Sequence, residues 1–389
     1  MNHPKQTFSQ AERLLLDACI VDETRQHSIA SLYAKLTDAV VWEAALSHEL
    51  EGLVAHRLVA ELGSDKVPAH WLLAHEQTRT RIEGFMAEMD RISERFSGAG
   101  VSCIALKNAG ITRALFPCPG CAPMGDIDLL VDKNDYLTAH QILLGEGYKC
   151  ASRNPTEGVG VREGRLSGGS EYFRETPDGH TFWVELQWRP VAGRWIRPDQ
   201  EPPANEMMQR SVAVPGSKIR ILSPEDNLLQ VALHTAKHTY LRAPGLRLHC
   251  DVERIVSGVE IDWSLFLHRV TQFKVRTVVY FSLAIPARFF GTPVPEWVLA
   301  ELKPPERKLR LIWSRLQKAG FFYPAQKKFT NLEYMFLGML LYDDVGGILK
   351  AACPGRQWMK SRYQFSSTVF LPYYYARRWT DLTFRRVGL

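Results

Sequence analysis

Two aspartates have the residue type and spacing of a divalent-metal site. The stretch PMGDIDLLVDKNDY at 123–136 places Asp126 and Asp128 two residues apart in a short apolar run. Side chains alternate along a β-strand, so both carboxylates would share one face while Ile127 and Leu129 point to the other. Burying such acids without partners costs several kcal/mol, whereas Mg²⁺ binds carboxylate, water and phosphate oxygens. The pair therefore predicts a metal site rather than two core positions.

A third acid, Glu185, lies in the strand-like run TFWVELQW at 181–188. If this run forms a neighbouring strand, its carboxylate completes a set that can hold the metals of an in-line phosphoryl displacement. The alternative is structural: Asp126 would shape the loop, and Asp128 and Glu185 would pair with Arg or Lys at a sheet edge.

The elements around these acids predict a small α+β unit. A strand (VSCIAL), a short helix (NAGITRALF), a Pro/Gly loop and the strand DIDLLV come first. The helix NDYLTAHQILLGEG and a hairpin of SEYFRE and TFWVELQW follow. This order is typical of a compact mixed sheet with helices packed on it.

The remainder of the chain has helical periodicity, from Ser9 to about Gly98 and again from Ser223. The segment SPEDNLLQVALHTAKHTY opens with Ser as the N-cap and Pro at the first helical position. We predict four regions: helical 1–98, an α/β core 99–200, helical 201–300 and a helical, basic and aromatic tail 301–389.

Composition indicates an ordinary globular protein, with 389 residues of which 46% are hydrophobic and 23% charged. The N-terminal segment lacks the apolar core of a secretory signal. The most apolar stretch, 278–286, is far shorter than the roughly 20 residues that a membrane-spanning helix needs. We therefore expect a cytoplasmic protein with no transmembrane segment.

The seven cysteines are odd in number and scattered, which predicts reduced thiols rather than a disulfide framework. CPGC, at Cys118 to Cys121, has the spacing of a redox or zinc half-site, but the sequence offers no second such pair. We interpret it as having no metal or redox role. His234 and His238, one helical turn apart, are interpreted as a structural or substrate-facing pair.

The net charge of +6 is concentrated at the C-terminus, where residues 353–389 contain seven Arg or Lys and one acid among many aromatic residues. Such a composition suits phosphates, nucleic acid or anionic lipid. It is equally that of a solvated helix with packed aromatic side chains, which is the interpretation we favour.

The chain resembles the uncharacterised nucleotidyltransferase family of the polymerase-β-like superfamily. The resemblance rests on CIALKNAGITRALF, GDIDLLV, YLTAHQILLGEGY and WVELQW in that order, and extends to helices on both sides, such as LSPEDNLLQVALHTAKH and LRLHCDVERIV. It implies a small mixed-sheet polymerase-β-like core embedded in a mainly helical chain.

The resemblance also implies roles for individual residues. Asp126, Asp128 and Glu185 would be the catalytic metal ligands, for Mg²⁺ or Mn²⁺. Lys107, Asn108 and Gly125 would lie near the nucleotide phosphates, with Gly125 allowing a tight turn into the strand. Three positions differ from the family pattern, which has Gly at the position of Asn108, Arg at that of Ala122 and His at that of Gln187.

The expected activity is transfer of a nucleoside monophosphate from an NTP such as ATP to a hydroxyl acceptor, with release of pyrophosphate. By resemblance, the acceptor would be a peptide, a sugar or another small molecule. Two alternatives remain open: a catalytically impaired binding or scaffold protein, motivated by the three departures, and a toxin-like enzyme directed at tRNA, motivated by the basic tail.

Overall fold

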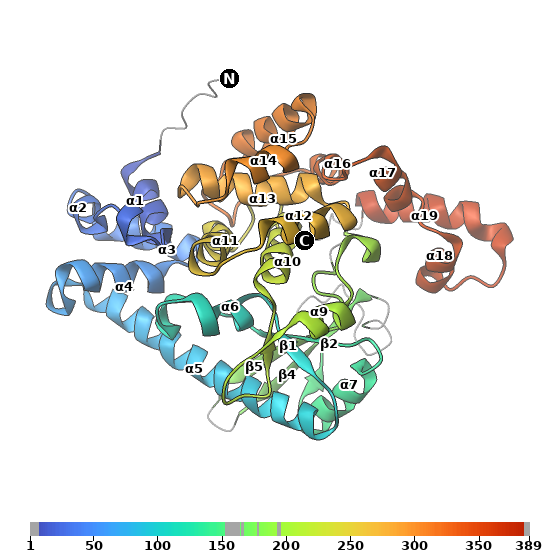
Figure 1. The fold of residues 1–389 in the computed structure, drawn as a ribbon, viewed down its shortest axis with the longest axis horizontal. Helices are drawn as coiled ribbons and strands as arrows, with labels where there is room; N and C mark the ends of the chain where they lie inside the picture. The colour runs from blue at the N-terminus through green and yellow to red at the C-terminus, as the bar shows by residue number, and fades with distance from the viewer. Residues whose placement is uncertain (1–7, 152–163, 165–166, 177–178, 193–195, 385–389) are drawn as a thin grey trace.

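The computed structural model describes residues 8–151, 164, 167–176, 179–192 and 196–384. The fold is α+β, as the sequence predicts: a mixed sheet lies at one end of a mainly helical chain (Figure 1). Most of the Gly-rich connection expected at 153–169, and the centre of the hairpin turn, lie outside the described residues.

The N-terminal region is helical, as predicted. Its helices are α1 Gln10–Cys19, α2 Ile29–Tyr33, α3 Asp38–Ser47, α4 Glu51–Leu62 and α5 Ala69–Gly98. Helix α5 is long enough to reach from the other N-terminal helices to the sheet, which it follows in Figure 1. Its apolar side chains, among them Phe85, Met89 and Phe96, enter the core beneath the strands. One helix therefore connects the N-terminal region to the α/β core.

The sheet has seven strands within the described residues, in the order β3-β4-β5-β2-β1-β7-β6. They are β1 Cys103–Ala105, β2 Ile127–Val131, β3 Lys149–Cys150, β4 Gly169–Glu175, β5 Thr181–Gln187, β6 Val212–Ala213 and β7 Arg220–Ile221. Strand β2 pairs antiparallel with β1 and parallel with β5, and β4 and β5 form the predicted antiparallel hairpin. Strands β6 and β7 were not predicted, because two-residue strands carry no readable alternation.

Three further helices, α6 Lys107–Leu115, α7 Tyr136–Gly145 and α9 Ala204–Arg210, pack around the sheet. Ile127 and Leu129 of β2 enter the core shared with α5 and α7, whereas Leu130 enters a second cluster with Met207 of α9. The faces of β2 therefore alternate as predicted, and Asp128 shares its face with Leu130.

The helices after the sheet are α10 Pro224–Lys237, α11 Leu246–Gly258, α12 Trp263–Gln272, α13 Arg276–Phe289, α14 Glu296–Leu302 and α15 Glu306–Ala319. Ser223 caps α10 as predicted, since its Oγ accepts from the backbone N–H of Asp226 at 3.4 Å. The C-terminal helices, on the right of Figure 1, are α16 Asn331–Leu340, α17 Val345–Ala352, α18 Arg356–Tyr363 and α19 Leu371–Phe384. Among the described residues, no helix combines the length and apolarity needed to cross a membrane.

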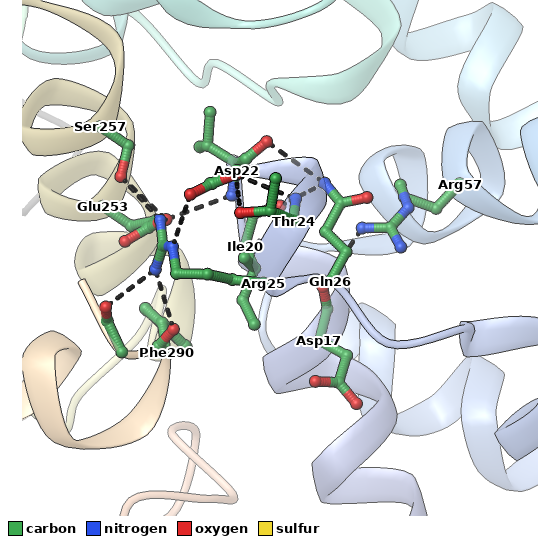
Figure 2. Close-up of polar contacts among 12 residues, drawn as sticks. Asp17, Ile20, Asp22, Thr24, Arg25, Gln26, Arg57, Glu253, Ser257 and Phe290 are labelled. Atoms are coloured by element: carbon green, nitrogen blue, oxygen red, sulfur yellow. Dashed lines mark hydrogen bonds and ion pairs between the residues drawn. The ribbon is translucent and has the colours of Figure 1, made fainter. Parts of the chain in front are cut away.

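Arg25 anchors the N-terminal helices to the later ones. Its guanidinium contacts Glu253 at 2.8 Å and Ser257 at 3.0 Å on α11, and donates to the carbonyl oxygens of Phe290 and Gly291 after α13 (Figure 2). Because Glu253 is fully buried, this charge-assisted contact compensates an otherwise costly carboxylate.

A disulfide joins Cys19 of α1 to Cys250 of α11, with Cα atoms 5.5 Å apart. The prediction of reduced thiols was therefore wrong for this pair. The two residues are 231 positions apart in the sequence and meet only because α1 packs against α11, so their spacing gave no signal.

Candidate metal and nucleotide site

The three predicted acids converge at one end of β2 and β5. Asp126 immediately precedes β2, and Asp128 is the register partner of Glu185 on the parallel neighbour β5. One carboxylate oxygen from each acid lies within 4.8 Å of the others. The side chain of Asp128 is 4% exposed and that of Glu185 25%, so solvent reaches the cluster from the side of Glu185. The cluster offers an all-oxygen ligand set, which suits Mg²⁺ or Mn²⁺.

Lys107 bridges two of these acids. Its Nζ lies 2.6 Å from Asp128 Oδ1 and 3.1 Å from Glu185 Oε2. The residue begins α6 directly after β1 and has a φ of 51°, in the left-handed region that non-glycine residues rarely adopt. The chain therefore turns sharply from strand to helix at the residue whose ammonium group faces the acids.

Gln187 adds a hydrogen-bond donor from the same face of β5. Its Nε2 donates to Asp128 Oδ1 at 2.9 Å, while its own Oε1 is buried without a partner. A histidine at this position, the usual residue in the family pattern, would also present an N–H group. The departure at Gln187 thus keeps a donor beside Asp128.

The charges of the cluster are strongly coupled. Burial raises the pKa of Asp128, and the negative charges of Asp126 and Glu185 add to this, although Lys107 opposes it. Burial also acts to raise the pKa of Glu185, but the positive charges of Lys107 and Lys237 outweigh it and lower that pKa to about 2. Burial alone would lower the pKa of Lys107, yet the three acids raise it above its ordinary value. The positive charge of Lys107 therefore offsets part of the negative charge of the three acids.

Residues 37–291 of the 389-residue chain match the sequence profile of a family described as "Uncharacterised nucleotidyltransferase". The chain belongs to this nucleotidyltransferase family. The match spans every residue of the acid cluster and most helices that pack around it. A search of curated proteins found no match. The enzyme class expected from the sequence is therefore confirmed: the protein is a nucleotidyltransferase.

In this nucleotidyltransferase, Asn108 faces Arg247 of α11 instead of the acids. With the amide oriented so that its oxygen faces the guanidinium, Asn108 Oδ1 accepts from Arg247 Nη1 and Nη2 at 2.9 and 3.0 Å. Arg247 also donates to the carbonyl oxygen of Pro123 and pairs with Glu49 at 3.2 Å. It thus links α6 to the loop before β2. The sequence analysis assigned no role to Arg247, since this contact joins residues 139 positions apart.

Two positions in that loop were singled out from the sequence, Gly125 as a tight turn and Ala122 as a departure from the family pattern. Gly125 does not have a positive φ, and a Cβ added there would meet no atom within 4 Å, so the backbone turn does not itself require glycine. Its assignment to nucleotide binding stays a prediction. Ala122, at the position where the family pattern has Arg, is buried with 2% of its surface exposed and offers no phosphate ligand of its own.

Helix α10 brings a further basic residue, Lys237, near the acid cluster. The sequence analysis singled out His234 and His238 of this helix but not Lys237. Burial lowers the pKa of Lys237, and the nearby charge of Lys107 adds to this. Lys237 Nζ donates to the carbonyl oxygen of Val191 at 3.1 Å. Burial likewise lowers the pKa of His234, with His238 and Lys107 contributing. The motif HTAKH therefore presents Lys237 as well as the histidines, and helical spacing of 234, 237 and 238 was the available signal.

Proposed function

We propose that the protein transfers a nucleoside monophosphate from an NTP, such as ATP, to a hydroxyl acceptor and releases pyrophosphate. The observation that carries this proposal is the convergence of Asp126, Asp128 and Glu185 within 4.8 Å, two of them in strand register. Membership of the nucleotidyltransferase family supports the reaction class.

The acids fit a divalent cation by charge and by ligand chemistry. Three carboxylates face one another, and burial disfavours the charged form of Asp128 unless a cation lies beside it. Asp126, Asp128 and Glu185 would hold Mg²⁺ or Mn²⁺. When bound, such an ion neutralises phosphate charge and makes the acceptor hydroxyl more acidic.

Lys107 is the residue that we assign to the triphosphate. Its ammonium now compensates Asp128 and Glu185, and its place at the start of α6 puts it beside backbone N–H groups that lack helical partners. Once another cation compensates the acids, Lys107 is released to pair with phosphate oxygens. Gln187 keeps Asp128 oriented through its Nε2 donor.

In the proposed reaction the acceptor oxygen attacks the α-phosphorus, forming a new P–O bond as the bond to the bridging α–β oxygen breaks. The hydroxyl proton passes to a carboxylate of the cluster, and pyrophosphate leaves. Asp128 and Glu185 are the candidate bases, because their carboxylates face each other across the paired strands β2 and β5.

Packing in the C-terminal tail favours a small-molecule acceptor, for which a peptide or sugar hydroxyl is our proposal, over a nucleic acid. Tyr374 stacks on Phe365 with ring centroids 4.8 Å apart, and the Arg378 guanidinium lies 4.4 Å from the Trp358 ring centroid. Tyr375 donates its hydroxyl to the carbonyl oxygen of Pro354. These contacts between α19 and residues 354–365 give part of the aromatic and basic composition a packing role.

The proposal is tested by binding of nonhydrolysable NTPs, measured calorimetrically with and without Mg²⁺ or Mn²⁺. Asp128→Asn should weaken metal-dependent binding by at least about 100-fold, since it removes a ligand worth several kcal/mol. Asp132→Asn is the matched control, because it lies just after the same strand outside the cluster. Absence of any metal-dependent NTP binding, or equal binding by both variants, would favour the scaffold alternative.

A further inference from the structure

Four metal-ligating side chains that the proposed reaction does not use converge on the loop before β2. His56 comes from α4 and His75 from α5, while Cys118 precedes and Cys121 ends the three-residue 3₁₀ turn η3, Pro119–Cys121. One ligand atom from each residue lies within 4.8 Å of all the others. The second pair that CPGC lacked in the sequence is thus supplied by two histidines from separate helices.

The distances within this Cys-His cluster are close to those around a tetrahedral ion, two of them about 0.1 to 0.2 Å shorter and one within the range. Cys118 Sγ lies 3.1 Å from Cys121 Sγ, 3.2 Å from His75 Nε2 and 3.7 Å from His56 Nδ1. Ligands of a tetrahedral zinc, with bonds of about 2.0 to 2.3 Å, stand about 3.3 to 3.8 Å apart. The sulfurs are too far apart for a disulfide bond of about 2.05 Å, and both cysteines are free thiols.

Backbone packing holds the four residues in place. A Cβ on Gly120 would lie 2.6 Å from the ring of His75, and one on Gly52 would lie 2.1 Å from the carbonyl oxygen of Gly120. Turn η3 therefore approaches both α4 and α5 as closely as glycine permits. The cluster is partly shielded as well: Cys121 is 1% exposed and the other three residues are half-buried.

We propose that His56, His75, Cys118 and Cys121 form a structural zinc site. Tetrahedral S₂N₂ coordination favours Zn²⁺, and two thiolates with two neutral imidazoles balance its charge. All four positions are filled by protein atoms, so no position is left open for substrate or water. A redox role fits less well, because Cys118 precedes a 3₁₀ turn and not an α-helix, and because two imidazoles face the sulfurs.

Such a site would fix one end of the loop whose other end carries Asp126. Cys121 lies five residues before Asp126, and between them the carbonyl oxygen of Pro123 accepts from Arg247. The zinc site would thus anchor the loop to α4 and α5 while Arg247 anchors it to α11. This role is independent of whether the acid cluster transfers nucleotides.

The experiment measures metal content of the full chain, purified without a histidine tag from zinc-containing medium. Elemental analysis should find one zinc per chain, and X-ray absorption should show two sulfur and two nitrogen neighbours at about 2.3 and 2.0 Å. The double variant Asp126→Asn/Asp128→Asn should retain this zinc, which separates the site from the acid cluster.

Ligand variants provide the second measurement. Cys121→Ser and His75→Gln should lose the zinc, whereas Cys353→Ser, at an exposed free cysteine, and His70→Gln, on the same helix as His75, should keep it. If the ligand variants fail to fold, Gly120→Ala keeps all four ligands but displaces His75. It should lower zinc affinity at least about tenfold in competition with a chromophoric chelator. Gly125→Ala, in the same loop with open space around it, is its control.

Several results would overturn the proposal: a reduced chain that takes up no zinc from ZnCl₂, full zinc content in His75→Gln, or a zinc with only oxygen neighbours. A chain isolated with Cys118 and Cys121 oxidised to each other and free of zinc would also contradict it.

Discussion

The acid cluster and the Cys-His cluster lie at opposite ends of one loop, yet their ligands differ in every respect that matters to a metal. The acid cluster has three carboxylates, a neighbouring lysine and a solvent-facing side, so an ion there could share its coordination sphere with substrate. The Cys-His cluster has four sulfur and nitrogen ligands, enough to fill every position around a tetrahedral ion. The type and number of ligands thus distinguish a candidate catalytic metal site from a candidate structural one.

The two clusters also depend differently on the fold. Asp128 and Glu185 face each other because two parallel strands are in register, a regular relation set by the backbone hydrogen bonds of the sheet. His56 and Cys118 are 62 residues apart and meet only where helices pack on a turn. Disturbing the helices should therefore damage the Cys-His cluster first.

Chelation should separate the clusters most strongly. Dialysis against EDTA should reduce metal-dependent NTP binding by at least about 100-fold, because Mg²⁺ keeps water ligands and exchanges readily. Zinc should remain in the Cys-His cluster under the same brief treatment. Adding Mg²⁺ back, without zinc, should restore binding. Calorimetry and elemental analysis of the same sample check this. Loss of both metals in the same treatment would contradict the expected difference in metal retention between the two clusters.

Replacing Lys107 should affect only the acid cluster. Lys107→Met removes charge-assisted hydrogen bonds worth about 1.5 to 3 kcal/mol, so NTP affinity should fall about 10- to 100-fold. Zinc content should not change. Lys133→Met is the control, since Lys133 lies beyond the end of β2 and packs its ammonium over Trp188. Unchanged NTP affinity in Lys107→Met would show that this residue compensates the acids without binding phosphate.

Low pH would release metal from both clusters by protonating their ligands. The effect of pH on the folding stability of the metal-free chain must therefore be measured separately. Burial lowers the pKa of His48 to about 4, helped by the charges of Lys328 and His249, and burial lowers that of His249 to about 4 as well. Both are neutral in the folded chain, while the unfolded chain binds protons below about pH 6.5. Stability should therefore rise between pH 4 and 6.5, and fall on acidification by ~1.4 kcal/mol per pH unit for each histidine.

Denaturation of the metal-free chain at several pH values measures this slope. His48→Gln should make the dependence shallower, although the variant also disturbs the hydrogen bond that His48 Nδ1 accepts from Leu246 N at 3.1 Å. Equal slopes in wild-type and His48→Gln would show that His48 does not contribute to acid unfolding.

Local sequence pattern was sufficient to predict the three acids and the strands that carry them. Alternation placed Asp126 and Asp128 on the side opposite Ile127 and Leu129, and a second alternating run identified Glu185 as the third acid. Ser223 and Pro224 marked the start of α10 for the same reason, since a cap is a contact between residues three apart. These features depend on neighbours in sequence, so the sequence alone determines them.

The rest depended on which helices pack together. Arg247 reaches Asn108, Lys237 lies near the acids, Cys19 meets Cys250, and two histidines complete CPGC, all across long separations in the chain. No period or motif encodes such contacts, because they arise from burying the apolar faces of α1, α4, α5, α10 and α11 against one another and the core. The sequence by itself determined the acids and the strands that carry them. Only the tertiary structure decided their cationic partners and the second cluster, because helix packing brings together side chains that sequence spacing keeps apart.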